Sequence, residues 1–193
     1  MTASEPSAHL DIYRDSGALL EGHFQLSSGL HSDRYLQSAL VLQDPAKAEI
    51  LCRGLAGKLP AGIEYVVGPA LGGVVVAYEL GRALGSYAQF TERKDGAMAL
   101  RRGFHLPAGA KTFIMDDILT TGTSIRECYE AIADSGADIV GCGCLVDRSA
   151  GEADVAGLPL YSLVQLTVQA WDPADCPLCR DGVPLEKPGS RSA

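Results

Sequence analysis

Two adjacent carboxylates followed by a hydroxyl-rich turn are the residues of this chain best suited to chemistry. Asp116 and Asp117 end an apolar segment, and residues 120–124 place four hydroxyls around Gly122. Small residues and a glycine let consecutive backbone N–H groups face one concavity at the start of a helix, where the helix dipole also favours an anion. We call residues 120–124 the phosphate turn, because this pattern suits a phosphate.

The two carboxylates would repel a phosphate, so we expect them to accept hydrogen bonds from hydroxyls elsewhere on the same ligand. The pattern therefore predicts a sugar phosphate. An ordinary strand-to-helix turn, with one Asp as a cap, would explain one carboxylate but not two beside four hydroxyls. The hydroxyls available to a phosphate belong to Thr120, Thr121, Thr123 and Ser124.

The segment from Met115 to Ser124 resembles the phosphoribosyl diphosphate (PRPP) binding motif of the type I phosphoribosyltransferases. That motif has an acidic pair, two apolar residues and a T-T-G-T-like loop. The resemblance implies an α/β fold, a central parallel sheet flanked by helices, with a small N-terminal hood. It also implies catalytic roles for the carboxylates and Mg²⁺ carried on PRPP, without a certain protein ligand. The implied PRPP-binding residues are Asp116, Asp117, Ile118, Leu119, Thr120, Thr121, Gly122, Thr123 and Ser124.

A second glycine-rich turn, residues 70–73, follows the apolar segment 65–69 and precedes an expected helix at 74–84. Two strand–glycine–helix units predict a parallel sheet with helical crossovers, in which ligands gather at the carboxyl ends of the strands. A Gly-Gly pair alone could serve only close packing. The family resemblance implies that this loop, with Leu71 and Gly72, binds pyrophosphate through backbone amides and often contains a non-proline cis peptide.

Residues 91–104, which we call the basic hairpin, place four cations in a chain whose net charge is −8. A hairpin carrying Arg93, Lys94, Arg101 and Arg102 could close over a polyanion and withdraw. A solvated surface hairpin is the alternative.

The basic hairpin resembles the catalytic loop of orotate phosphoribosyltransferases, which usually reads R-K-x-x-K-x-H-G. Arg93 and Lys94 match the first two positions and are the implied catalytic cations. The later Lys and His are absent in register because the loop turns early at residues 95–96, and His105 lies too far along the chain. We expect Arg101 or Arg102 to supply the missing charge in this shorter-loop branch, and both to bind PRPP.

An arginine follows the apolar segment 138–146, which reads as another buried strand ending in Asp147. At the carboxyl end of such a strand the planar guanidinium of Arg148 could bind a carboxylate at two points. A surface ion pair with Asp147 is the alternative. The segment resembles the family's L-D-R segment, whose Arg contacts orotate, so Arg148 and Thr120 are the implied orotate-binding residues.

Residues 22–35 mix strand-like alternation with Ser, Gly and His, which suits either a lid or a surface hairpin. The segment resembles the family's F-x-L-x-S-G-x-x-S hood. The resemblance implies orotate contacts at Tyr35 and Leu36.

The chain contains six cysteines, and Met1–Ser7 shows no visible export signal. The missing signal favours the cytoplasm as location, and it favours free thiols or a bound metal over disulfides. Cys176 and Cys179 form a C-P-x-C knuckle typical of half a zinc site. Cys142 and Cys144 could complete four thiolates. They could equally be small core residues on one side of a strand.

The length of 193 residues favours one domain, with residues 1–43 as the hood region and 170–193 as an irregular tail. No apolar run approaches a membrane span, and the negative charge argues against nucleic acid as a partner.

Two helices have recognisable starts. Asp44 and Pro45 predict the beginning of one whose buried face includes Ile50, Leu51, Leu55 and Leu59. Ser124 and Glu127 have the spacing of a capping box for the other.

Together the motifs predict transfer of the phosphoribosyl group from PRPP to orotate, giving orotidine 5′-monophosphate and pyrophosphate. A uracil or purine phosphoribosyltransferase shares the central motif, and a non-catalytic PRPP-sensing regulator could share the fold. A homodimer is implied by the resemblance to a family that shares its loop across subunits.

Overall fold

The computed structural model describes residues 8–26 and 28–188. The chain divides into two compact units. The larger unit is Leu42–Leu166, and the smaller unit consists of Met1–Val41 and Thr167–Ala193. The stretch Met1–Ser7, on which the expected location depends, lies outside the described residues. None of the helices in the described ranges combines the length and apolar character that a membrane span requires.

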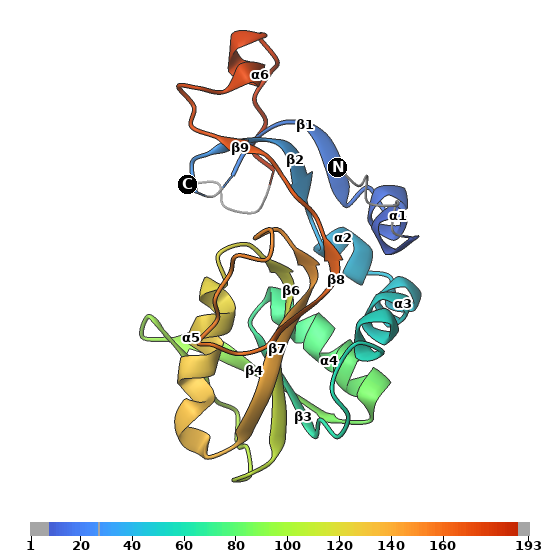
Figure 1. The fold of residues 1–193 in the computed structure, drawn as a ribbon, viewed down its shortest axis with the longest axis vertical. Coiled ribbons are helices and arrows are strands. Elements are labelled where there is room, and N and C mark those ends of the chain that lie inside the picture. Colours follow the sequence, from blue (N-terminus) through green and yellow to red (C-terminus); the bar gives the residue numbers. More distant parts are fainter. Residues whose placement is uncertain (1–7, 27, 189–193) are drawn as a thin grey trace. The chain divides into compact units, whose positions relative to one another are not determined.

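The larger unit is built on a six-stranded sheet (Figure 1). All neighbouring strands are parallel except the edge pair, which forms an antiparallel hairpin. The predicted parallel sheet is therefore confirmed. In sheet order the strands are β5 (Ala97–Leu100), β4 (Tyr87–Lys94), β3 (Tyr65–Pro69), β6 (Lys111–Leu119), β7 (Asp138–Asp147) and β8 (Leu160–Gln165).

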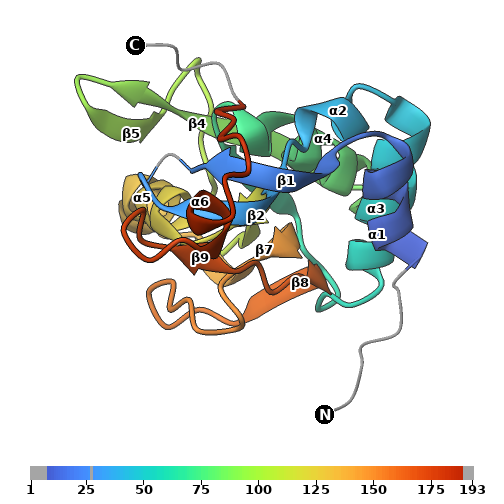
Figure 2. The same ribbon diagram turned by 90° about the horizontal axis from the view of Figure 1, so that it is seen from above.

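Helices cover both faces of this sheet (Figures 1 and 2). Helices α3 (Pro45–Ala56) and α4 (Gly72–Leu84) lie on one face, and α5 (Thr123–Ile132) lies on the other. A short helix, α2 (Ala39–Leu42), precedes α3, and a 3₁₀ turn, Ala133–Ser135, follows α5. Each crossover returns the chain to the same edge of the sheet, so the carboxyl ends of β3, β6 and β7 lie together.

The core explains one error in the sequence analysis. Asp44 caps α3 as predicted, accepting a hydrogen bond from the Ala46 backbone N–H at 3.0 Å. Ile50, however, is 52% exposed. The buried face of α3 consists of Ala48, Leu51, Cys52 and Leu55, and a residue one step before Leu51 is rotated about 100° away from it. Leu59 lies beyond the end of the helix.

The capping box predicted for α5 is also wrong. The helix begins two residues earlier than that cap implies, at Thr123, and its N-cap is Gly122 with a φ of 76° and no side-chain cap. Glu127 instead forms an ion pair with Arg93 of the basic hairpin. A glycine can adopt this left-handed conformation without strain, so the turn does not need a side-chain cap.

Cys142 and Cys144 are core residues of the larger unit. Both lie fully buried on β7 in a cluster with Ile114, Leu119 and Ile125. Burial raises the pKa of the Cys142 thiol to about 12. The hypothesis that these two thiolates complete a zinc site is therefore wrong, and the alternative of small core residues is confirmed.

The smaller unit contains a three-stranded antiparallel sheet in the order β1 (Leu19–Gln25), β2 (His31–Leu36) and β9 (Ala170–Trp171). Helix α1 (Ala8–Asp15) precedes β1, and Gly17 follows it at a φ of 64°. The C-terminal segment expected to be irregular contains β9 and the one-turn helix α6 (Pro177–Arg180). The expected hood and tail segments thus meet in one unit.

Candidate active site

The two carboxylates lie at the carboxyl end of β6, in an extended part of the strand. Asp116 is only 7% exposed, and its Oδ1 accepts a hydrogen bond from the Asp117 backbone N–H at 2.9 Å. The Oδ1 of Asp117 accepts from the Ile118 N–H at 2.8 Å. Each carboxylate is therefore held by the next peptide, at the end of the strand where ligands of parallel sheets bind.

Burial, reinforced by the negative charge of Asp117, raises the pKa of Asp116 well above its usual range. Two carboxylates this close, one of them buried, repel each other in a poorly solvated place. Ligand hydroxyls or a cation would relieve that repulsion. Carboxylate oxygens are the hard donors that Mg²⁺ prefers, so the residues present fit a magnesium ion arriving on a phosphorylated ligand.

The phosphate turn encloses a small pocket of about 50 Å³ at the N-terminus of α5. Gly122 is required there, because a Cβ at this position would lie 2.9 Å from the Val155 Cγ2 and the φ of 76° disfavours other residues. The hydroxyls of Thr121 and Thr123 lie 2.9 Å apart. The pocket is lined by Asp116, Ile118, Leu119, Thr120, Thr121, Gly122, Thr123, Ser124 and Ile125.

The second glycine-rich turn lies directly against the acidic strand end. A Cβ on Gly72 would be 2.7 Å from the Oδ1 of Asp117, so glycine leaves this carboxylate in contact with backbone. A Cβ on Gly73 would be 2.9 Å from the Met115 carbonyl oxygen. The peptide bond between Ala70 and Leu71 is cis. Glycine thus serves close packing here, and the same packing places the turn at residues 72–73 against Asp117.

Arg148 follows β7, the strand next to β6. Its backbone N–H donates to the Leu119 carbonyl at 2.8 Å, which places it beside the start of the phosphate turn. The carboxylate of Asp147 is buried and accepts from the Ser149 N–H at 2.7 Å and the Ser149 hydroxyl at 2.6 Å. The two residues implied for orotate, Thr120 and Arg148, therefore come from adjoining strand ends.

The basic hairpin turns at Asp95 and Gly96, as predicted. Their φ values of 52° and 89° suit the two-residue turn of a β-hairpin, and Lys94 pairs with Ala97 across it. Lys94 is exposed and forms no ion pair with any residue in the described ranges.

The arginines of the basic hairpin are held by carboxylates. Arg102 donates to both oxygens of Glu92, at 3.0 and 2.9 Å, and its guanidinium lies 5.7 Å from the centre of the Phe90 ring. Arg101 lies 3.5 Å from Glu92. Arg93 pairs with Glu127 and donates to the Gly96 carbonyl at 2.9 Å. The roles of Glu92 and Glu127 as ion-pair partners were not predicted. Glu92 could have been recognised because it stands beside Arg93 in the sequence, whereas Glu127 lies on α5, 34 positions after Arg93.

Tyr35 and Leu36 lie on β2 of the smaller unit. The Leu36 side chain is buried, and the Tyr35 ring lies 6.0 Å from the Phe24 ring. Both side chains therefore contribute to packing within that unit.

A larger cavity, of about 410 Å³, lies at the opposite ends of the strands, near the starts of β3, β4 and β6. Its one carboxylate, Glu64, accepts a hydrogen bond from the Lys111 N–H at 2.9 Å. Ligands of parallel sheets bind at the carboxyl ends of the strands, and only that end here combines two carboxylates, a helix N-terminus and cations among the described residues.

Known proteins resemble this chain along most of its length. The phosphoribosyl transferase domain family matches residues 41–173. The orotate phosphoribosyltransferase of Pelotomaculum thermopropionicum is 49% identical over 181 residues, covering 93% of this chain and 95% of that protein. That of Acidithiobacillus ferrooxidans is 49% identical over 195 residues, covering 99% and 98%. The crystal structure of orotate phosphoribosyltransferase from Aeropyrum pernix has a TM-score of 0.69 at 27% identity, covering 81% and 92%.

Proposed function

The chain belongs to the phosphoribosyl transferase family as an orotate phosphoribosyltransferase, and we propose here how its own residues divide the work of that reaction. The enzyme is a pentosyltransferase that moves the 5-phosphoribosyl group from PRPP to orotate. The products are orotidine 5′-monophosphate and pyrophosphate. Orotate and PRPP are accordingly its small-molecule substrates.

The observation that carries the residue assignment is the junction of three elements at Asp117. The Gly72 turn lies against this carboxylate, and the phosphate turn begins three residues after Asp117, just past the end of β6. PRPP carries ribose hydroxyls between two phosphorylated ends. An acidic pair between two glycine-rich turns matches that order, with the 5′-phosphate in the phosphate turn and the pyrophosphate at residues 71–72.

The reaction needs opposite charges on its two sides. As pyrophosphate departs, the ribose carbon becomes cationic and negative charge grows on the leaving group. Asp116 and Asp117 hold the ribose hydroxyls and place their negative charge near the cationic sugar. Arg93, Lys94, Arg101 and Arg102 meet the pyrophosphate and exclude the water that would hydrolyse the activated sugar.

Arg148 is proposed to orient orotate. Its guanidinium can bind the orotate carboxylate at two points, while Thr120 offers backbone and hydroxyl groups beside it. A uracil or hypoxanthine ring lacks that carboxylate, so Arg148 favours orotate over the uracil and purine alternatives. The proposal that Tyr35 and Leu36 also contact orotate depends on family resemblance alone.

Magnesium is proposed as the cofactor. It would reach the site on oxygens of PRPP, with Asp116 and Asp117 beside it, and would neutralise charge on the pyrophosphate when bound. The cytoplasm is the proposed location.

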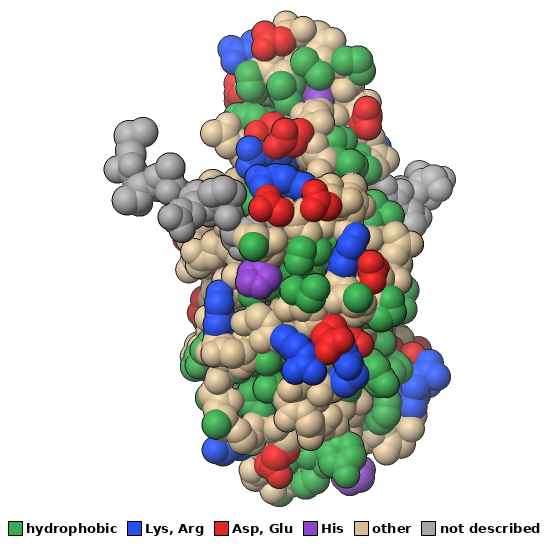
Figure 3. All heavy atoms as spheres, turned by 90° about the vertical axis from the view of Figure 1, so that its right-hand side faces the viewer, with side chains coloured by type: hydrophobic (Ala, Val, Ile, Leu, Met, Phe, Trp, Pro, Cys, Tyr) green, Lys and Arg blue, Asp and Glu red, His purple; other side chains and the backbone are tan. Residues whose placement is uncertain are grey.

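A homodimer is proposed from the surface of α4. Leu71, Val75 and Tyr78 recur at helical spacing and are 87%, 44% and 64% exposed. Figure 3, which views the side on which α3 lies, shows apolar side chains exposed between small mixed groups of acidic and basic residues. A row of large apolar side chains beside a binding loop is typical of an interface. Light scattering on the parent and Tyr78→Glu tests it, and a monomeric parent would contradict it.

The substrate assignment is tested by following PRPP consumption with orotate, uracil, hypoxanthine or no base. We expect turnover with orotate and little with the others. Preferred turnover of uracil or hypoxanthine would contradict the role of Arg148. PRPP binding without turnover of any base would favour a PRPP-sensing regulator.

A further inference from the structure

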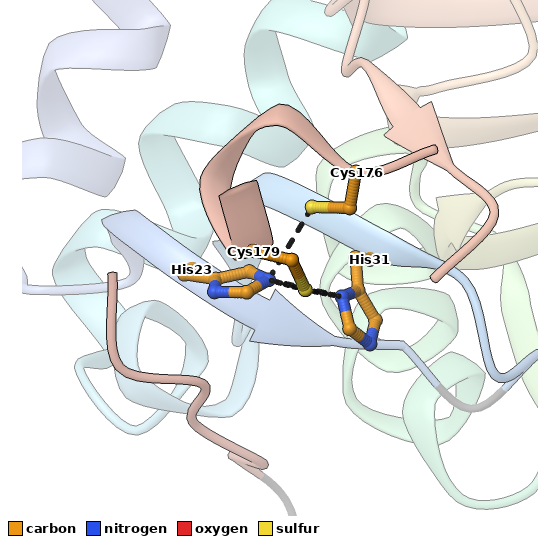
Figure 4. A group of neighbouring side chains, drawn as sticks. All are labelled: His23, His31, Cys176 and Cys179. Carbon is orange, nitrogen blue, oxygen red and sulfur yellow. Dashed lines mark hydrogen bonds between the residues drawn. The ribbon is translucent and has the colours of Figure 1, made fainter. Parts of the chain in front are cut away.

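Four metal-ligating side chains of the smaller unit converge on one point (Figure 4). His23 comes from β1 and His31 from β2, whereas Cys176 is the N-cap of α6 and Cys179 lies within that helix. One ligand atom from each of the four lies within 4.8 Å of every other. Both imidazoles and the Cys176 thiol are buried.

The separations of these atoms are close to those of a tetrahedral zinc site. The Nε2 of His23 lies 3.0 Å from the Nδ1 of His31 and 3.5 Å from the Cys176 sulfur. The Cys179 sulfur lies 3.7 Å and 3.3 Å from the same two nitrogens. Zinc bonds of about 2.3 Å to sulfur and about 2.0 Å to nitrogen give ligand-to-ligand spacings of roughly 3.3 to 3.8 Å.

The other nitrogen of His23 is already oriented. Its Nδ1 lies 2.8 Å from the Val183 carbonyl oxygen, which can only accept a hydrogen bond. Nδ1 therefore carries the proton, and in the neutral ring the lone pair is on Nε2, the atom that faces the sulfurs. A backbone carbonyl in this role is the usual outer partner of a metal-binding histidine.

Chain segments far apart in sequence build this cluster. The register of β1 against β2 shifts between Glu21 and Phe24, and such a bulge turns a side chain to the other face. The C-terminal segment pairs with β2 through residues 170–171 and with β1 through Glu186, whose backbone bonds to His23 and Gln25 at 2.8 Å. The knuckle between these two attachments is thereby held over the hairpin.

We propose that His23, His31, Cys176 and Cys179 bind one structural Zn²⁺. Two thiolates and two imidazoles at tetrahedral spacing suit zinc, and four protein ligands close the site to substrate. The ion joins the N-terminal hairpin to the C-terminal segment of a unit whose own apolar core is small, where a metal adds folding free energy. The site is independent of the phosphoribosyl transfer proposed above.

The sequence pattern indicates half of this site. The C-P-x-C knuckle indicated Cys176 and Cys179, but the completing ligands were sought in Cys142 and Cys144. The signal that could have found them is a pair of histidines eight residues apart, 23 and 31, on two strands of one expected hairpin.

Metal analysis of the purified full-length protein tests the proposal. The parent, dialysed against EDTA at neutral pH, should retain about one zinc per chain by mass spectrometry of metals. Cys179→Ser is the first variant because Cys179 is exposed and its loss leaves the cores intact. It should lose its zinc in the same dialysis, as should His23→Gln. Matched controls are Cys52→Ala and His105→Ala, a buried thiol and an exposed imidazole outside the cluster, which should keep zinc.

A second measurement covers the case of a variant that folds poorly. Parent protein stripped with a stronger chelator and loaded with Co²⁺ should show the visible absorption bands of tetrahedral cobalt with thiolate ligands, and zinc should displace them. A parent with no more zinc than Cys179→Ser would overturn the proposal. Iron at one per chain in place of zinc, or a Cys176–Cys179 disulfide found by mass spectrometry, would overturn it as well.

Discussion

The acidic end of β6 and the basic hairpin, which we propose to serve opposite charges of one ligand, are constructed differently. Asp116 and Asp117 are each fixed by the next backbone N–H within a buried strand. The cations of the hairpin are exposed, and its arginines rest on Glu92 and Glu127. Exposed ion pairs are weak, so a polyanion can take over these arginines at little cost.

This difference separates two tasks. The acidic strand end is preorganised, which suits groups that must meet a developing cation without moving. The arginines of the basic hairpin are held in weak ion pairs, from which a bound polyanion can release them. This suits a hairpin that closes after the ligand has bound. Variants on the two sides should therefore fail in different ways.

The largest effect is expected from Asp117→Asn. The amide oxygen can still accept from Ile118, so the fold should persist, while the lost charge should lower kcat by roughly 10²- to 10³-fold. Steady-state kinetics with thermal melting measures both, and Asp134→Asn, an exposed carboxylate beyond α5, is the control. Turnover equal to the parent would remove Asp117 from the site.

Lys94→Ala tests the other side of the comparison. Because Lys94 is exposed and has no ion-pair partner in the described ranges, its loss should leave Tm unchanged and reduce kcat by about 100-fold. Lys187→Ala, an exposed lysine of the C-terminal segment, should change neither. A large drop in Tm for Lys94→Ala would mean that the hairpin is structural.

Arg148→Ala should separate the two substrates. Losing a charge-assisted, two-point contact is expected to raise the KM for orotate roughly 10- to 100-fold while the KM for PRPP stays nearly constant. Initial rates with each substrate varied in turn provide the test. A parallel rise in both constants would contradict a role specific to orotate.

Asp116→Asn should stabilise the ligand-free protein while impairing catalysis. Folding raises the pKa of the Asp116 carboxyl, so this group stabilises the folded protein at pH values below the pKa of the unfolded chain, about 4. That contribution is lost as the pH rises through the folded-state pKa, and at neutral pH the buried charge is a cost that asparagine does not carry. The variant should therefore melt on the order of 2 to 4 °C above the parent at neutral pH, and the gap should close near about pH 4. A lower Tm than the parent at neutral pH would mean that the buried charge is already compensated.

The smallest effect is expected from Glu92→Gln. Freeing Arg101 and Arg102 from their carboxylate should lower the KM for PRPP by roughly two- to fivefold, because the ion pairs no longer compete with pyrophosphate. Glu49→Gln is the matched control, since Glu49 forms similar exposed pairs with Arg53 and Arg82 on the helical side. A higher KM in Glu92→Gln would show that these pairs position the hairpin for binding.

The features predicted correctly from sequence depend on neighbours within a few residues. The strand that carries Asp116 and Asp117 and the early hairpin turn at residues 95–96 formed where expected, although β6 continues to Leu119 and α4 begins at Gly72, two residues before the expected start. Strand burial, glycine conformation and turn chemistry act over such short ranges. The residue roles drawn from family resemblance, including those of Tyr35, Leu36 and Arg148, stay predictions.

The errors occurred where a residue had several possible partners. Glu127 had the spacing of a cap, yet it pairs with Arg93, 34 positions earlier. Ile50 is apolar, but its angular position on α3 decides that it faces solvent. Cys142 and Cys144 were plausible zinc ligands until β7 placed them in the core.

The sequence by itself determined the family and the succession of an acidic strand end, a glycine-containing turn and a helix, because a contiguous motif carries its own geometry. Only the tertiary structure decided which residues from distant segments meet. It placed Gly72 against Asp117, and it brought His23 and His31 to Cys176 and Cys179. The physical reason is that strand pairing and helix packing fix these distances, and both depend on the burial of the whole chain.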